Sequence, residues 1–536
     1  MSTRRTTATP SLSFRPRWRR PLHLLHRWAG VVLAPFFVMW FASGIVLAYV
    51  KFPRLTRPER LAAAPALDFS TAKLSPARAA ATLRAGEFRL RGTPTGNLAL
   101  PAPADPAAPV RPRAVRLTQV QGRPAYVFTA GMAQPVVVFA DDGSRPGPAT
   151  PERAVSAAHA FAGGGAPRYL ETLQSDQWSV GFELNEHRPL LRVAMGDGAG
   201  TEYYVSSVTG EVVRDTRRRE RLLNWLGSVP HWIYPHFLRK HPAAWEWVVD
   251  ILAVAGVVVV LAGIAVGFLR LRRRAARPRT ARQCVARWHY FAGLAFGAVA
   301  LTWVFSGWMS MNPRGFSPFV FPSPTEMFLF SGGPLDLSRF SSVPELPENT
   351  VEASLLCYAK QPLVLASSRD GLDSLLPATL GTDPVLPTAD AILARVRELM
   401  PGVPLAGAAV LTGYDNHYYT RHPEEAAQPL PVVRARFADG KNTWFHIDVK
   451  TGRLLDKSTA GSRVFRHLYR GLHSFDWWWL WSRRPLWDIA IVGGSLGGLA
   501  LSLAGLALAL RHLRRTLHLQ PFSSPPQTPP PQTPTQ

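Results

Sequence analysis

Cysteine is almost absent from this sequence, since Cys284 and Cys357 are the only two in 536 residues. They fall in segments that the long apolar runs of the chain separate onto opposite sides of a membrane, so they cannot pair with each other. Disulfide scaffolds, dithiol redox chemistry and thiolate metal clusters are therefore set aside.

Familiar catalytic motifs are also lacking. No GxSxG, HExxH, GxGxxG or GxxxxGKS pattern stands in a suitable context, which weakens hydrolase and nucleotide-driven functions. No soluble dinucleotide or flavin domain is visible in the sequence. Any electrons that the protein uses would therefore come from another carrier.

Charge is missing from four long apolar runs, at residues 28–50, 251–269, 288–312 and 489–510. Each is about 19 to 25 residues long, which at 1.5 Å per residue crosses a hydrocarbon core of roughly 30 Å. The first run continues into Lys51 and Phe52 without a small-residue cleavage site, which favours an anchor over a signal peptide. The sequence predicts four transmembrane helices.

Acidic residues are few beside basic ones, with 36 Asp and Glu against 61 Lys and Arg and a net charge of +25. Residues 1–27 and 270–287 contain several arginines and no acidic residue. Three more arginines, Arg511, Arg514 and Arg515, follow the last run. In a four-pass topology these clusters share one side, as the positive-inside rule requires. We expect both termini in the cytoplasm, a bacterial inner-membrane location, arginines on headgroups of the lipid bilayer, and no nucleic acid as partner.

The apolar runs divide the chain into nine segments. They are a basic cytoplasmic tail (1–27), helix one (28–50), a first external domain (51–244), helix two (245–270), a basic loop (271–287), helix three (288–312), a second external domain (313–484), helix four (485–511) and a disordered tail rich in Pro, Gln and Thr (512–536). Strand patterns at 201–213 and 432–455 and a helical pattern at 389–399 indicate that the external domains are α+β.

The chain contains an internal repeat of helix, external domain and helix. A spacing of 242 residues relates Arg221 to Arg463, His231 to His473 and Trp245 to Trp487, and a spacing of 263 relates His26 to His289 and Ser43 with Gly44 to Ser306 with Gly307. Both copies begin on the same membrane side, so the halves should be related by an axis along the membrane normal. Equivalent residues should then lie at equal depth.

Four of the 15 histidines recur in both copies near the membrane boundaries. His26 and His289 stand at the cytoplasmic starts of helices one and three, and His231 and His473 precede helices two and four on the external side. An ionisable ring at such depth is costly without a partner, so it indicates function. Two imidazoles close both axial positions of a haem iron and favour electron transfer over oxygen binding. Without a CxxCH pattern the haem would be of the b type, and we expect two.

The repeat favours the pairs His26 with His289 and His231 with His473, although pairing within one half stays open. A histidine bonded to backbone or headgroup at the interface is the simpler alternative for each ring. The series His231, His236 and His241 also suits zinc, copper or non-haem iron, but prolines interrupt any continuous helix through it. His23 and His467 are reserve candidates without a counterpart.

A second candidate site is the external stretch that holds Tyr414, Asp415, His417 and Arg421. Phenol, carboxylate and imidazole groups ligate ferric iron, and arginine binds an anionic chelate. We therefore regard these four as candidate substrate residues. A strand-end cluster packed against its own domain is the simpler explanation.

Four segments carry a family resemblance: LHRWAGVVLAPFFVMWFASGIVLAYV from residue 25, RWHYFAGLAFGAVALTWVFSGWMSMNP from 287, TWFHIDVKTGRLL from 443 and RHLYRGLHSFDWWWLWSRRPLWDIAI from 466. Together they resemble the PepSY-associated transmembrane family over nearly the whole chain. The resemblance implies an α-helical polytopic membrane protein with four transmembrane helices, duplicated as 2+2, and two extracytoplasmic α+β PepSY-like domains.

The resemblance also has functional implications. Members of the FoxB type are inner-membrane ferrisiderophore reductases that hold haem between their helices, and His26, His231, His289 and His473 lie in the matching segments. Other PepSY proteins are thought to bind or restrain extracytoplasmic peptidases, so the family does not fix one activity.

The favoured hypothesis is an oxidoreductase that passes electrons through two haem b groups, from an unknown electron donor to a ferric siderophore or similar ferric chelate outside. Reduction loosens such a chelate, because its hard oxygen donors suit ferric better than ferrous iron. Two alternatives are a non-enzymatic PepSY membrane module that binds a periplasmic partner such as a peptidase, and a transporter of iron or its chelate. No charged residue inside the four runs marks an ion path for the transporter.

Overall fold

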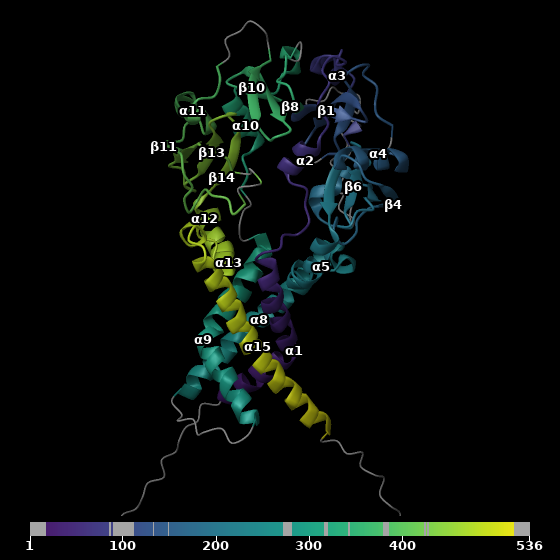
Figure 1. The fold of residues 1–536 in the computed structure, drawn as a ribbon. Helices are drawn as coiled ribbons and strands as arrows, with labels where there is room; N and C mark the ends of the chain where they lie inside the picture. The colour runs from purple at the N-terminus through teal and green to yellow at the C-terminus, as the bar shows by residue number, and fades with distance from the viewer. Residues whose placement is uncertain are drawn as a thin grey trace, which may run out of the picture.

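The computed structural model describes residues 18–84, 87–88, 112–131, 133–147, 149–271, 281–315, 320–340, 344–378, 385–422, 425 and 428–518. The chain forms a bundle of long helices, here called the stalk, with β-sheets at one end, here called the head (Figure 1). Most of the basic tail expected at 1–27, of the loop at 271–287 and of the tail at 512–536 lies outside the described residues.

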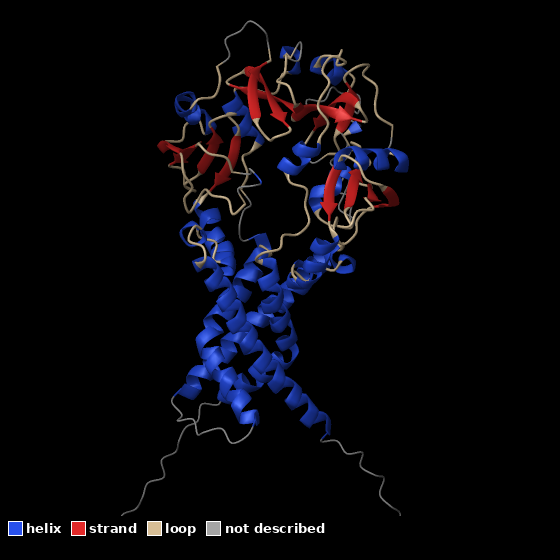
Figure 2. Cartoon of the chain, in the orientation of Figure 1, coloured by secondary structure: helices blue, strands red, loops and turns tan. Residues whose placement is uncertain are grey.

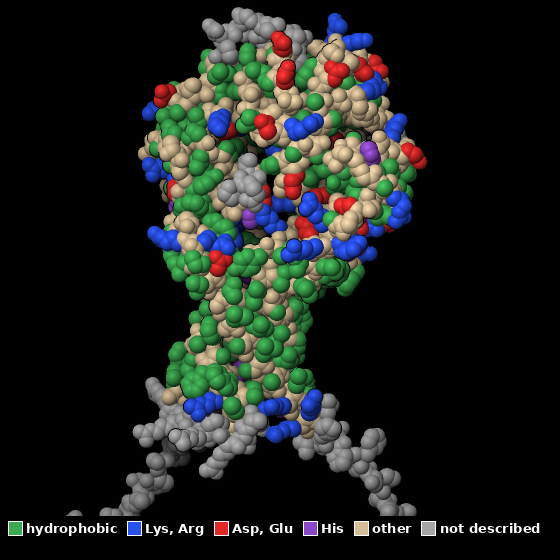
Figure 3. All heavy atoms as spheres, in the orientation of Figure 1, with side chains coloured by type: hydrophobic (Ala, Val, Ile, Leu, Met, Phe, Trp, Pro, Cys, Tyr) green, Lys and Arg blue, Asp and Glu red, His purple; other side chains and the backbone are tan. Residues whose placement is uncertain are grey.

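Four helices of the stalk are long and apolar enough to cross a membrane. They are α1 (Arg19–Leu47), α8 (Pro242–Leu271), α9 (Ala281–Ser310) and α15 (Leu486–His518). At the end away from the head each continues past its uncharged run into a basic stretch, because long arginine side chains reach the headgroups from inside the boundary. Figure 3 shows an apolar stalk with basic side chains at both ends. The protein is a multi-pass membrane protein.

The four long helices pack as a ring. Helix α1 lies against α8 and α15, and α9 also lies against α8 and α15, which leaves α1 and α9 on one diagonal. The centre is filled by Leu33, Phe37, Phe41, Val259 and Ala300. Residues from both halves of the chain therefore meet in the middle of the stalk.

The head contains a six-stranded antiparallel sheet to which both external segments contribute. In sheet order its strands are β10 (Asp373–Pro377), β9 (Gln361–Ser368), β8 (Thr350–Tyr358), β1 (Ala114–Val120), β2 (Arg123–Thr129) and β3 (Val136–Phe139). The central pair joins the two segments, with Arg116 of β1 opposite Ser354 of β8. The expectation of one domain in each half did not include this shared sheet.

Each external segment also has its own four-stranded antiparallel sheet, with strands in chain order (Figure 2). The first follows α4 (Pro151–Ala162) and comprises β4 (Arg168–Leu173), β5 (Leu190–Ala194), β6 (Glu202–Ser206) and β7 (Val212–Thr216). The second follows α11 (Ala389–Arg395) and comprises β11 (Leu405–Leu411), β12 (Val432–Phe437), β13 (Trp444–Asp448) and β14 (Leu454–Ser458). The strand and helix patterns expected at 201–213, 389–399 and 432–455 fall on these elements, so the α+β character of the head is confirmed.

Short helices connect the sheets to the stalk. In the first half they are α5 (Arg218–Leu226), α6 (Ser228–His231) and α7 (His236–Arg239); in the second they are α12 (Ala460–Arg466), the π-helix η7 (His467–Gly471), α13 (Leu472–Ser474) and α14 (Trp478–Trp481). Helix α2 (Arg57–Ala63) and helix α3 (Pro76–Ala81) follow α1 and lead into the six-stranded sheet. Because α6 packs on α1 and α13 packs on α9, these connectors bring polar residues against the stalk.

Candidate functional site

Two histidines face each other across the stalk near its end away from the head. His26 lies in the second turn of α1 and His289 in the third turn of α9, the two diagonal helices. Their ring centroids are 6.2 Å apart and their planes are inclined at 32°. The structure thus brings together the two histidines that the spacing of 263 residues relates.

A second histidine pair lies at the head end of the stalk. His231 ends α6 and His473 lies in α13, and their ring centroids are 5.9 Å apart with planes at 67°. Each ring lies against a long helix of its own half: the His231 ring contacts Trp40 of α1, and the His473 ring contacts Trp303 of α9. From His26 to Trp40 the helix rises by roughly 21 Å at 1.5 Å per residue, so the pairs lie at different depths.

All four rings make the same kind of hydrogen bond through Nδ1. The acceptors are backbone carbonyl oxygens: Val259 for His26 at 3.0 Å, Leu501 for His289 at 3.1 Å, Trp40 for His231 at 3.1 Å and Trp303 for His473 at 3.1 Å. A carbonyl only accepts, so Nδ1 must carry the proton and Nε2 keeps a lone pair. Among the described residues no hydrogen-bond partner of Nε2 is found. Neutral imidazoles held in this way are the form that binds metals.

Each histidine ring also lies on a glycine. The nearest ring atom is Cε1 in every case, and it lies 2.6 Å from the position that a Cβ would take at Gly263 for His26, 3.2 Å at Gly505 for His289, 3.2 Å at Gly44 for His231 and 3.4 Å at Gly307 for His473. A larger residue at these positions would press on the imidazole. The sequence repeat contained the matched Ser-Gly pairs 43–44 and 306–307, but their contact with the histidines was not predicted.

The geometry of both pairs fits one metal between two imidazoles. With a metal–nitrogen bond of about 2.0–2.1 Å and about 1.1 Å from that nitrogen to the ring centre, two opposed imidazoles on one metal have centroids about 6.3 Å apart. The observed 6.2 and 5.9 Å are close to this value. A porphyrin leaves two coordination positions of its iron for ligands from the protein, and each pair offers two imidazoles. The donor set therefore fits haem. The ligand role of the four residues itself stays a prediction.

Aromatic side chains fill the stalk between the two pairs. Phe41 lies 5.8 Å from Trp303 and 6.4 Å from Phe37, measured between ring centroids. The glycines of α15 admit these rings, because a Cβ at Gly498 would overlap Phe41 and one at Gly494 would meet Trp303 at 3.1 Å. The interior between the histidine pairs is therefore apolar and closely packed.

Other histidines that the sequence singled out lie apart from the pairs. The His236 ring is bonded to Ser175 at 3.0 Å from Nε2 to Oγ, and His241 is exposed. His467 accepts a hydrogen bond from the Trp477 indole at 3.2 Å. Among the described residues no group of three or more His, Cys, Asp or Glu is arranged to hold a metal ion.

The candidate substrate residues divide into two groups. The Asp415 carboxylate accepts hydrogen bonds from two guanidinium nitrogens of Arg434, at 2.6 and 2.9 Å. It also accepts hydrogen bonds from the backbone N–H groups of His417 and Tyr418. Burial would raise the pKa of Asp415, but these hydrogen bonds outweigh that effect and hold it well below its usual range. The Tyr414 hydroxyl donates to the Gln428 carbonyl at 2.9 Å. These two side chains are engaged in holding their own loop.

The other two candidates lie beside tryptophans. The His417 ring packs edge-on against Trp444, with centroids 5.0 Å apart, and burial lowers its pKa. The guanidinium carbon of Arg421 lies 4.7 Å from the Trp481 ring centroid and 5.1 Å from that of Trp487. The four residues therefore do not converge on one point in this structure.

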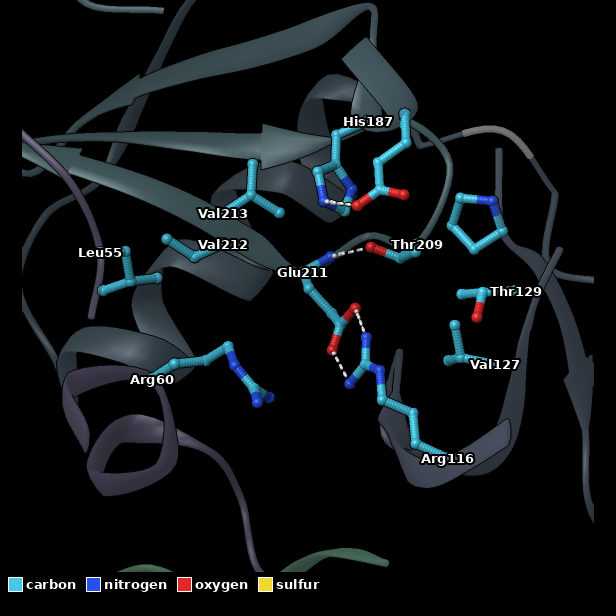
Figure 4. A pocket seen from close by; sticks show the side chains of 12 residues that line it. Leu55, Arg60, Arg116, Val127, Thr129, His187, Thr209, Glu211, Val212 and Val213 are labelled. Carbon is cyan, nitrogen blue, oxygen red and sulfur yellow. Dashed lines mark hydrogen bonds and ion pairs between the residues drawn. The ribbon is translucent and has the colours of Figure 1, made fainter. Parts of the chain in front are cut away.

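A polar cluster that sequence reasoning missed lies inside the head, in a pocket of about 260 Å³ (Figure 4). Arg116 donates two hydrogen bonds to Glu211, at 2.8 and 2.5 Å, and one to Glu352 at 3.1 Å. Burial would raise the pKa of Glu211, but Arg116 outweighs it and lowers the pKa to about 2. Burial lowers the pKa of His187, in the same pocket, to about 4. Because Glu352 belongs to the second external segment, Arg116 ties both segments together.

Comparison with known protein families matches residues 23–348 to the family described as PepSY-associated TM region. The match includes α1, α8 and α9 with His26, His231 and His289, and it ends before β8 and His473. A comparison with curated proteins gave no match. Since the family match covers more than half of the chain, the protein belongs to the PepSY-associated transmembrane family.

Proposed function

We propose that this protein is an inner-membrane oxidoreductase of the ferrisiderophore reductase type, with the head outside and both termini in the cytoplasm. It would take single electrons from a separate electron donor, pass them across the bilayer and reduce a ferric siderophore or similar ferric chelate on the head side, one electron converting one ferric ion to ferrous. The observation that carries the proposal is the presence, at two depths of the stalk, of histidine pairs spaced for one metal each. When bound there, haem b supplies reversible one-electron transfer.

The residues of the chain would prepare these sites in two ways. Backbone carbonyls such as those of Val259 and Trp303 keep the proton on Nδ1, so that each Nε2 would keep a lone pair for a metal. Phe37, Phe41 and Trp303 exclude water from the interior between the pairs. A dry, low-dielectric interior keeps ions from leaking through the protein while electrons pass.

The proposal includes a 2+2 duplication with two PepSY-like domains. Three features support it. The spacing of 242 residues relates the acceptors Val259 and Leu501, the spacing of 263 relates Trp40 and Trp303, and each external segment places a helix before a four-stranded antiparallel sheet. Equivalent groups then act at equal depth, as an axis along the membrane normal requires.

The chelate is proposed to approach the head near residues 414–421, above the His231–His473 pair. Asp415 is held by Arg434 at 2.6 Å, whereas Arg421 is 4.0 Å from Asp476 and keeps 24% of its side chain exposed, so His417 and Arg421 are the two proposed contacts of that stretch with an anionic chelate. Arginine provides charge-assisted hydrogen bonds to carboxylate or similar oxygens.

The haem content of the purified protein tests the proposal most directly. Protein in detergent should show a Soret band and a reducible α band, with about two haems per chain by pyridine haemochrome assay. Reduced protein should turn a ferric chelate into ferrous iron that a ferrous-specific dye captures. A folded but colourless protein would contradict the proposal and favour a non-enzymatic membrane module.

Replacing Gly263 by alanine should weaken haem binding at the His26–His289 pair. The new Cβ would lie 2.6 Å from Cε1 and 3.0 Å from Nδ1 of His26, so the ring must turn away from its carbonyl partner. Loss of such a supporting contact lowers metal affinity by about 10–100-fold, measurable by haem titration of the apoprotein.

Gly267→Ala is the matched control, because Gly267 lies one turn further along the same helix and a Cβ there meets Leu294 at an ordinary 3.6 Å. Equal haem affinities of the two variants would show that Gly263 does not support the His26 ring.

A further inference from the structure

Helix α5 has its polar and apolar faces reversed relative to a helix on a water-exposed surface. Leu222, Trp225 and Leu226 are 61%, 51% and 64% exposed, and their spacing puts them on one face. The buried residue of the helix is the polar Asn224, which donates to the Lys51 carbonyl and accepts from the Ser228 hydroxyl. An apolar face turned outward and a polar residue turned inward indicate an apolar surrounding.

The depth of this face in the structure is set by contacts with α1. Gly227, which follows α5 directly, lies so close to Val46 that a Cβ there would meet that side chain at 3.0 Å. Four residues later the His231 ring is bonded to Trp40. Val46 and Trp40 belong to the last two turns of α1, inside its uncharged run. Trp225 and Leu226 therefore lie level with the membrane-crossing part of α1, although they belong to the head.

Basic residues border the apolar face on the side of the head. Arg217, Arg218 and Arg219 are exposed at the start of α5. At the other end of the segment Arg239 of α7 lies over the rings of Trp245 and Tyr234, at 4.5 and 5.2 Å. Figure 3 shows apolar side chains where the head faces the stalk, with Lys or Arg side chains above them. This is the arrangement of an interfacial helix, with leucine in the acyl region, tryptophan at the boundary and arginine at anionic headgroups.

We propose that residues 217–239, here called the foot, insert into the head-side leaflet and bind anionic phospholipid there. The exposed Phe237 of α7, at 72%, and Trp247 of α8, at 70%, continue the apolar surface to the adjoining span. The apolar face is larger in the first half, because the positions that the spacing of 242 residues relates to Trp225 and Leu226 hold a partly buried histidine and a partly buried leucine, and only Val464, related to Leu222, is exposed, at 57%. The proposal does not depend on haem.

Spin labelling tests the immersion of the foot. Cys284 and Cys357 are replaced, and a single cysteine is introduced by Leu226→Cys or, as the control, by Leu372→Cys, a 67% exposed leucine of the head in the turn before β10. The full-length protein is reconstituted in phosphatidylcholine vesicles with or without phosphatidylglycerol. We expect the label at 226 to collide several-fold more often with oxygen than with a water-soluble nickel chelate, relative to the label at 372.

The outcomes separate the two parts of the proposal. Equal collision ratios at 226 and 372 would overturn membrane insertion. Immersion that is unchanged when phosphatidylglycerol is omitted would overturn the preference for anionic lipid. Arg218→Gln with Arg219→Gln should reduce the immersion in phosphatidylglycerol vesicles to the level in phosphatidylcholine alone, and an unchanged immersion would remove these arginines from the lipid contact.

Discussion

On the proposed function, replacing His473 by alanine should lower the haem content from about two to about one per chain, since one of the two residues that would hold the head-side haem is lost. Ferric chelate reduction should fall by more than about 100-fold, because loss of a ligand costs more than loss of a supporting hydrogen bond, which costs about 10–100-fold. The remaining haem, at the His26–His289 pair, should still be reduced by dithionite. Optical spectra and pyridine haemochrome assays measure both effects.

The complementary variant His26→Ala should remove the other spectral component, because His26 and His473 belong to pairs at different depths. His241→Ala is the control, since that ring is exposed and belongs to neither pair. His231→Ala decides the pairing: it should remove the same component as His473→Ala, whereas loss of the component that His26→Ala removes would show that the rings pair within a half rather than across the stalk. If neither His473→Ala nor His26→Ala changes the spectrum, these histidines are not the ligands.

Replacing Arg116 by methionine should destabilise the head by about 3–5 kcal/mol, the usual cost of leaving a buried partner charge unpaired. Glu211 would lose the two hydrogen bonds that it accepts from Arg116 and remain enclosed in the pocket of Figure 4. Thermal unfolding of the detergent-purified protein, followed by tryptophan fluorescence, measures the loss.

Arg123→Met is the matched control, because Arg123 also binds a carboxylate with two nitrogens in the same sheet, but its side chain is 36% exposed, against 24% for Arg116. An exposed pair contributes about 1 kcal/mol or less. Equal losses in the two variants would show that burial of the Arg116 cluster is not important for stability.

The pH dependence of stability should also change sign in the Arg116 variant. In the native protein the pKa of Glu211 is lowered from 4.5 to about 2, so its contribution is complete above pH 4.5 and is lost as the pH falls towards 2. Without Arg116, burial raises the pKa of Glu211, so the variant should gain stability relative to native protein as the pH falls from 7 towards 5. Unfolding temperatures of the variant and the native protein that differ by the same amount throughout that range would contradict this expectation.

The sequence alone determined the membrane-crossing part of the protein. A span must satisfy its backbone hydrogen bonds internally and present an apolar surface, so the four uncharged runs indicate α1, α8, α9 and α15 without knowledge of the fold. The spacing of equivalent histidines also indicated which rings would meet, because an internal repeat whose halves start on one side would place equivalent residues at one depth.

Only the tertiary structure decided how the head is assembled and how the sites are supported. The pairing of β1 with β8, and the ion cluster of Arg116, Glu211 and Glu352, join residues more than 90 positions apart, and no local pattern encodes such partners. The carbonyls that fix the tautomers of the four histidines come from neighbouring helices or their ends. Backbone acceptors leave no signature in side-chain sequence, so they become visible only when the helices are packed.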